Sequence, residues 1–160
     1  MEDYIVVDDT IHIDVGFAEK IQEKQIVEIF RKLQKINSYG ISKSYGIYGM
    51  NLNSSLSHYE RAMSEFSKLF KFKYLFNALE IATDIDGNDI KRDDLDKEAK
   101  RIDPMNCTDV EKWRKFYNRI RHVQRNPRDI KIYEEGEKDL SQKLLTSRRC
   151  TQEVLLSRLY

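Results

Sequence analysis

The feature that most constrains the fold is a set of apolar residues that recur every three or four positions between residues 55 and 83. This period matches one face of an α-helix. We therefore predict a helix from about Ser55 to Thr83, with Asn53 or Ser54 as its N-cap, and expect it to form the spine of the core. The apolar positions are Leu56, Tyr59, Met63, Phe66, Leu69, Phe70, Tyr74, Leu75, Ala78, Leu79 and Ala82.

Four other segments have helical patterns: residues 17–36, 92–101, 109–124 and the segment that follows Asn126-Pro127. Thr108 and Glu111 form a capping box at the start of the third of them. The last begins at Asp129 or Asp139 and continues to the carboxyl terminus, and Gly136 is the position at which it would divide in two. Residues 37–50 are rich in glycine and tyrosine and are predicted to form a loop.

The amino-terminal residues favour two strands, Tyr4 to Val7 and Ile11 to Val15, joined by a short turn. The predicted fold class is therefore all-α, an up-and-down four-helix-type bundle with a small N-terminal β-hairpin. A chain of 160 residues fits one domain and can bury a core without disulfides or a metal. We assign residues 1–160 to a single helical domain, with residues 1–16 as the hairpin appendage and 17–160 as the helical bundle.

The two cysteines, Cys107 and Cys150, lack CxxC or Cys/His ligand spacing. Neither a disulfide framework nor a zinc site is predicted, so we expect free thiols in a reducing compartment. The amino-terminal segment is acidic and alternates apolar with polar residues, unlike the continuous apolar core of a signal peptide, and no apolar stretch is long enough to span a membrane. The sequence predicts a cytoplasmic protein with no cofactor and no metal.

The 28 basic and 27 acidic residues nearly cancel, so net charge alone predicts no polyanionic partner. Their distribution is more informative, because eight basic residues lie between Lys112 and Lys131 against one acid, Asp129. This is a local positive stripe. It is either a binding surface or a solvated face that pairs with the acidic segment from Asp84 to Asp103.

Within this stripe, helical spacing places Arg114, Asn118 and His122 on one face, flanked by Arg121 and Arg125. An imidazole can transfer a proton near neutral pH, and guanidinium groups can hold a phosphate and neutralise its charge. The combination favours chemistry on a phosphodiester.

Residues 117–122, YNRIRH, resemble a motif on a late helix of the HEPN superfamily, which comprises small, usually dimeric helical domains of toxin-antitoxin and antiviral systems. The segment from Tyr74 through Leu79 and Glu80 is similar to the Tyr and apolar-Ala-Leu-Glu pattern of a preceding helix in that family. The resemblance covers roughly Leu56 to Tyr133, and its motifs are short.

The resemblance implies metal-independent RNA cleavage at a homodimer interface, where two copies of the motif converge. It also implies an antitoxin or a regulatory protein as a partner. The catalytic residues so implied are His122, Asn118 and Arg119; the residues that hold RNA phosphate are Arg114, Lys115, Arg121 and Arg125; Glu80 and Tyr117 are supporting residues.

The chain departs from the family at one position. Active members have an Arg separated from the His by four to six residues, and those positions here are Lys115, Phe116 and Tyr117. Lys115 keeps the charge without the planar, bidentate donor. The departure leaves open a noncatalytic helical dimerisation or protein-interaction module whose stripe binds an acidic partner. DNA binding is less favoured, because no helix-turn-helix spacing precedes the basic helix.

Overall fold

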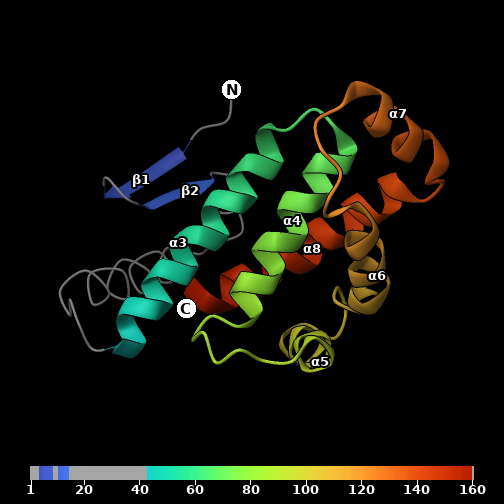
Figure 1. Ribbon diagram of the computed structural model, residues 1–160. Coiled ribbons are helices and arrows are strands. Elements are labelled where there is room, and N and C mark those ends of the chain that lie inside the picture. The colour runs from blue at the N-terminus through green and yellow to red at the C-terminus, as the bar shows by residue number, and fades with distance from the viewer. Residues whose placement is uncertain (1–3, 9–10, 15–42, 160) are drawn as a thin grey trace.

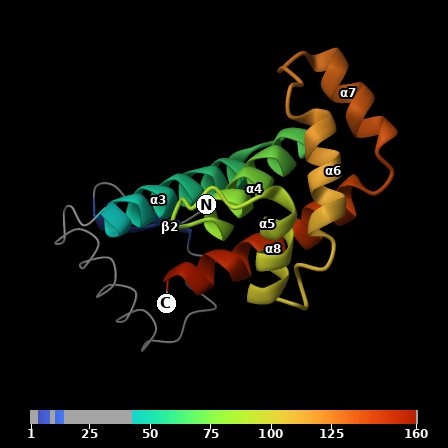
Figure 2. The same cartoon turned by 60° about the horizontal axis from the view of Figure 1, so that its bottom comes forward.

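The computed structural model describes residues 4–8, 11–14 and 43–159, with side chains from residue 46 to 159. From residue 43 onward the chain folds into helices joined by short loops (Figures 1 and 2). The six helices are α3 (Lys43–Ser64), α4 (Lys68–Thr83), α5 (Arg92–Ile102), α6 (Val110–Ile120), α7 (Pro127–Gly136) and α8 (Leu140–Leu159). Two short strands, β1 (Tyr4–Asp8) and β2 (Ile11–Asp14), pair antiparallel. The helix predicted over residues 17–36 lies outside the described residues.

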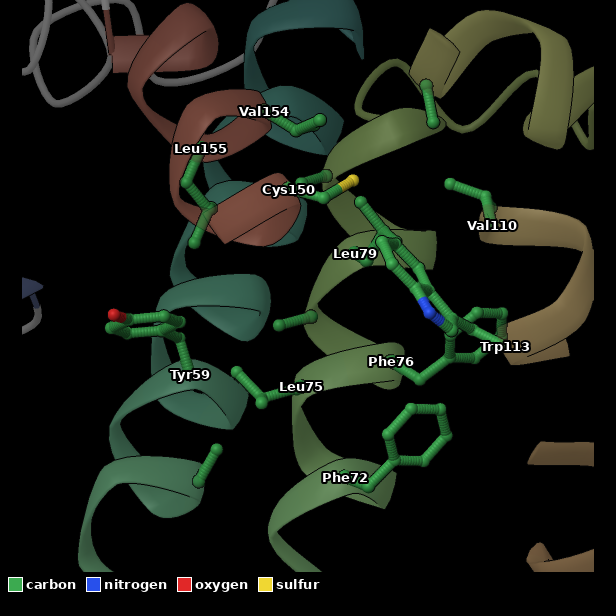
Figure 3. Packing of buried hydrophobic residues seen from close by; sticks show 14 of the residues in the cluster. Tyr59, Phe72, Leu75, Phe76, Leu79, Val110, Trp113, Cys150, Val154 and Leu155 are labelled. Carbon is green, nitrogen blue, oxygen red and sulfur yellow. The ribbon is translucent and has the colours of Figure 1, made fainter. Parts of the chain in front are cut away.

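Helix α4 is the centre of the bundle. It packs along α3 on one side and α8 on the other, while α5 and α6 cover its remaining face (Figures 1 and 3). Its apolar residues occur around most of the helix circumference, which is typical of a helix buried on several sides. The buried residues of α4 are Leu69, Phe70, Phe72, Leu75, Phe76, Ala78, Leu79, Ala82 and Thr83.

The predicted all-α class is confirmed for residues 43–159, but the single helix predicted over residues 55–83 is wrong. The chain turns at Glu65–Ser67, so that α3 and α4 lie antiparallel as a helical hairpin (Figure 1). Ser67 begins α4 as its N-cap, because its hydroxyl oxygen accepts a hydrogen bond from the Phe70 amide at 3.3 Å. Phe66, predicted to be a core residue, is instead fully exposed at this turn.

Helix α3 also begins earlier than predicted, because residues 43–50 are helical although they were predicted to form a loop. Asn53 and Ser54, the predicted N-caps, therefore lie inside the helix. Tertiary contacts outweigh the low helix propensity of the glycines here. The Tyr48 hydroxyl donates to the Arg158 carbonyl, and the Asn51 amide donates to the Ile85 carbonyl at 3.0 Å.

Helix α5 agrees with its prediction, and the division of the last helical segment at Gly136 is confirmed. Helix α6, in contrast, ends at Ile120 rather than Gln124. The predicted capping box is wrong as well, because Asp109 rather than Thr108 is the residue before the helix, and its side chain makes no capping hydrogen bond. Asn126 caps α7, and Pro127 occupies the first turn, where its missing N–H is not needed.

The prediction of two free thiols is wrong, because Cys107 and Cys150 form a disulfide. Cys107 lies just before α6 and Cys150 in the middle of α8, and both are fully buried. Packing of the α5–α6 connection against α8 brings their Cα atoms to 5.0 Å although they are 43 residues apart. Sequence spacing cannot reveal such a contact. Because the two thiols are not free, they no longer support the inference of a reducing compartment.

None of the helices between residues 43 and 159 is both long enough and apolar enough to cross a bilayer. Within the same part of the chain, His, Cys, Asp and Glu side chains form no group of three that could hold a metal ion.

Candidate functional site

The basic residues of α6 do not share one face. Arg114 points toward α5, where its Nε lies 2.9 Å from Asp96 Oδ2 and its Nη2 lies 3.1 Å from Asp93 Oδ1. The Arg114 side chain is only 16% exposed, and Asp96 is buried. The positive stripe was predicted either to bind a partner or to pair with the acidic segment from Asp84 to Asp103. Arg114 is the stripe residue for which the described ion pairs show the second arrangement. Arg114 thus joins α5 to α6 and is poorly placed to hold an external phosphate.

Glu80, predicted to be a supporting residue, lies half-buried on α4 close to the same ion pair. Burial raises the pKa of Glu80, an effect that Arg92, Arg114 and Arg121 partly offset and Asp96 reinforces. Burial also raises the pKa of Asp96, although its hydrogen bond and ion pair with Arg114 act in the opposite direction. The interface of α4, α5 and α6 therefore holds two carboxyl groups that are harder to ionise than usual.

Replacing Glu80 with Gln should stabilise the protein at neutral pH. Because the pKa of Glu80 is raised in the folded state, protonation of Glu80 stabilises the fold. This contribution to the free energy of unfolding is complete below the ordinary glutamate pKa of about 4.3 and is lost as pH rises through the folded pKa. Glu80→Gln should therefore raise the urea midpoint at neutral pH and leave it unchanged in acid. Glu135→Gln, at an exposed site of α7, should change neither midpoint.

Tyr117, the second predicted supporting residue, fastens α6 to α4. Its hydroxyl donates to Asn77 Oδ1 at 2.6 Å, and its ring lies 4.8 Å from that of Phe76. Burial raises the pKa of Tyr117, Glu80 raises it further and Arg121 lowers it. Tyr117 therefore acts as a half-buried hydrogen-bond donor that helps to set the position of α6.

Arg119 and His122 face the opposite side, toward α7, where they line a shallow depression. Arg119 and His122 are exposed, and Arg119 Nη2 lies 3.3 Å from Glu137 Oε2. The Arg119 guanidinium also lies over the Phe116 ring at 5.2 Å. The other lining residues, for which the sequence contains no local signal, are Val123, Gln124, Asn126, Asp129 and Tyr133.

His122 lies in the turn that follows α6, and its partner is the neighbouring arginine. Arg121 Nε donates a hydrogen bond to His122 Nε2 at 3.0 Å. A guanidinium group can only donate, so Nε2 must be the acceptor, and the proton of the neutral ring is on Nδ1. A phosphate that attracted Arg121 would free Nε2 to accept a proton from a bound hydroxyl group.

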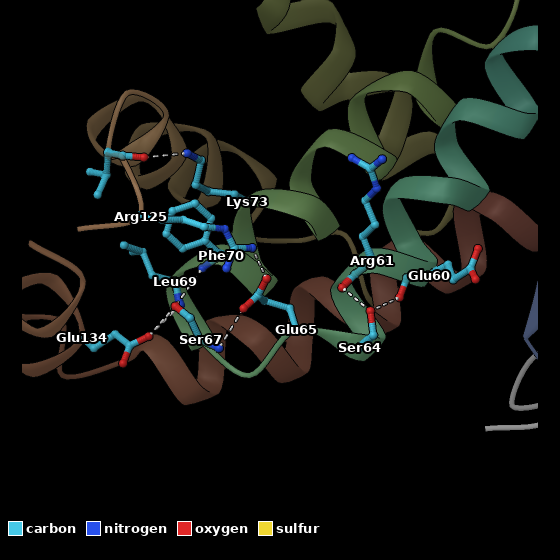
Figure 4. A network of polar contacts seen from close by, with 11 residues as sticks. Glu60, Arg61, Ser64, Glu65, Ser67, Leu69, Phe70, Lys73, Arg125 and Glu134 are labelled. Atoms are coloured by element: carbon cyan, nitrogen blue, oxygen red, sulfur yellow. Dashed lines mark hydrogen bonds and ion pairs between the residues drawn. The ribbon is translucent and has the colours of Figure 1, made fainter. Parts of the chain in front are cut away.

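The remaining predicted site residues lie away from this depression. Asn118 is half-buried one turn before His122 and does not line it. Lys115 is exposed on α6 and pairs with Glu111 at 2.8 Å. Arg125 points toward the α3–α4 turn, where it pairs with Glu65 (Figure 4). Of the predicted catalytic residues, the structure thus brings together Arg119 and His122, with Arg121 bonded to the imidazole.

Comparisons with known proteins returned nothing: no family model matches the chain, and neither a curated protein nor a solved structure is significantly similar to it.

Proposed function

We propose that this chain is a HEPN-like RNA-binding protein that holds a phosphodiester in the depression between α6 and α7. The observation that carries the proposal is the exposed His122, with Arg121 bonded to its Nε2 and Arg119 on the same wall of the depression. Arg119 and Arg121 supply donors suited to phosphate oxygens. His122 adds a group that can accept a proton near neutral pH.

We further propose that His122 promotes metal-independent cleavage of the bound RNA. Its Nε2 takes the proton from the ribose 2′-hydroxyl, and the 2′-oxygen forms a bond to phosphorus while the bond from phosphorus to the 5′-oxygen breaks. The 5′-oxygen takes a proton from water, and the hydroxide that remains takes the proton back from His122, which leaves a 2′,3′-cyclic phosphate and a 5′-hydroxyl. Arg119 and Arg121 neutralise the charge that develops on the phosphate. In the homodimer that the HEPN resemblance implies, two such sites would converge.

The binding step is tested with Arg119→Gln. Because this substitution removes one phosphate contact, it should weaken binding of a labelled single-stranded RNA and reduce the slope of log affinity against log salt by about 0.7. Fluorescence anisotropy over a salt series measures both quantities. Lys97→Gln, at an exposed position of α5, is the matched control and should leave both unchanged. Equal slopes for wild type and Arg119→Gln would contradict binding at this depression.

A noncatalytic interaction module is the second candidate, and one observation favours it. The arginine nearest to the family spacing, Arg114, is occupied by Asp93 and Asp96. In this case the exposed cations around His122 would bind an acidic protein, such as an antitoxin. Purified protein that neither binds nor cleaves RNA would favour this candidate over the first.

A further inference from the structure

The α3–α4 turn displays an aromatic ring that the proposed site does not use. Phe66 is 100% exposed, although burial of an aromatic ring is strongly favourable. We propose that Phe66 stacks on a base of single-stranded RNA and so extends the binding surface beyond the His122 depression. The inference rests on the proposed RNA-binding function and adds a site for the bases to the site for the phosphate.

The turn is held rigidly from two directions (Figure 4). On one side, Glu65 Oε1 accepts from the Ser67 amide at 3.2 Å. On the other side, Glu134 of α7 accepts from the Ser67 hydroxyl at 2.8 Å and from the Leu69 amide at 3.2 Å. Because the backbone around Phe66 is already ordered, the ring can bind a flat partner with little further loss of conformational entropy.

The connection between α6 and α7 links this turn to the depression. Arg125 pairs with Glu65, and Lys73 Nζ donates to the Val123 carbonyl at 3.2 Å (Figure 4). Since Arg125 is three positions after His122, their Cα atoms are at most about 11 Å apart. An RNA strand that leaves the depression toward Phe66 would therefore pass the side chain of Arg125, which is 58% exposed.

Helix α7 places a second aromatic ring on the other side of this connection. Tyr133 lines the depression, and the next residue, Glu134, holds the α3–α4 turn. Helix α7 thus carries one exposed ring, Tyr133, and through the next residue holds the turn that displays the other, Phe66. Successive bases of a single strand stack on aromatic rings spaced along a cationic surface.

The chemistry around Phe66 favours RNA over an apolar protein partner. The turn residues beside it are Ser67 and the acid Glu65, whose charge is paired with Arg125, and the exposed side chains that flank the turn include the cations Lys68 and Arg125. An aromatic ring beside cations suits a base and its phosphate. A protein contact of useful affinity would instead surround the ring with apolar side chains.

The test is the affinity of the full chain for a fluorescein-labelled uridine oligonucleotide, measured by fluorescence anisotropy. Phe66→Ala should weaken binding about tenfold, while Phe66→Tyr, which keeps a ring, should bind like wild type. The salt dependence should be unchanged, because Phe66 contacts no phosphate. Met105→Ala, which removes another exposed apolar side chain at the α5–α6 connection, should have no effect.

An abasic oligonucleotide separates stacking from indirect effects, because the Phe66→Ala variant and wild type should bind it equally. If wild type binds no RNA, the proposed function itself fails. If wild type binds RNA but Phe66→Ala and Met105→Ala bind alike, only the stacking role is overturned. A Phe66→Ala variant with unchanged RNA affinity and a lower mass in sedimentation equilibrium would identify the turn as a contact between copies of the chain, which also overturns it.

Discussion

His122→Ala protein should leave end-labelled RNA intact under conditions in which the wild-type protein cleaves it. General acid–base catalysis by one side chain typically contributes about 100- to 10,000-fold to the rate, so the loss should exceed the effect of any other single substitution at the depression. The readout is the amount of labelled product with a 2′,3′-cyclic phosphate end, separated on a denaturing gel. RNA binding by this variant should persist, since Arg119 and Arg121 remain.

His58→Gln is the matched control for this experiment. His58 lies half-buried on α3 with its ring 6.1 Å from that of Tyr74, apart from the depression. Its substitution should not change the cleavage rate. Cleavage that survives in His122→Ala would exclude His122 as the proton-transfer group, and a contaminating nuclease would act equally in both variants. Intact RNA in all samples, including wild type, would remove the catalytic proposal and leave the binding proposal standing.

The sequence predicted those parts of the fold that depend on local pattern. Most core positions of α4, the charged helix α5 and the break at Gly136 follow from periodicity and turn residues, whereas the buried Phe72 and Phe76 of α4 were not predicted. The α3–α4 turn was not predicted, because Phe66 fits the apolar period although it lies at an exposed turn. The local signal for this turn is Ser67, the N-cap of α4, since serine is a preferred N-cap residue.

The candidate site was predicted only in part, because the local pattern does not show which neighbouring helix each side chain meets. Residues Arg114 and Arg119 are five positions apart, which separates their side chains by about 140° around a helix. Arg114 therefore meets the acids of α5 while Arg119 faces α7. His122 lies beyond the last turn of α6, so helical spacing could not place it relative to Asn118. Tyr133 joins the depression only because α7 folds back toward α6, which is a tertiary contact with no local signature.

Loss of the Cys107–Cys150 disulfide should cost a large part of the stability of the protein. The bond closes a loop of 43 residues that contains α6, α7 and half of α8. In the chain-entropy account, a crosslink of this length restricts the unfolded ensemble by about 4 kcal/mol. A domain of this size is typically stable by only about 5–15 kcal/mol, so the variant Cys107→Ala/Cys150→Ala should unfold at a much lower urea concentration.

Fluorescence of Trp113, the single tryptophan, reports this transition because its side chain is only 2% exposed in the core. Wild type unfolded with an excess of dithiothreitol is the matched control, since it removes the bond but keeps both sulfur atoms. If the crosslink acts mainly on the unfolded chain, the reduced wild type and the double variant should have similar midpoints, both well below that of the oxidised protein. Equal midpoints for oxidised and reduced wild type would show that packing of α8 against α4 and the α5–α6 connection holds this region without the bond.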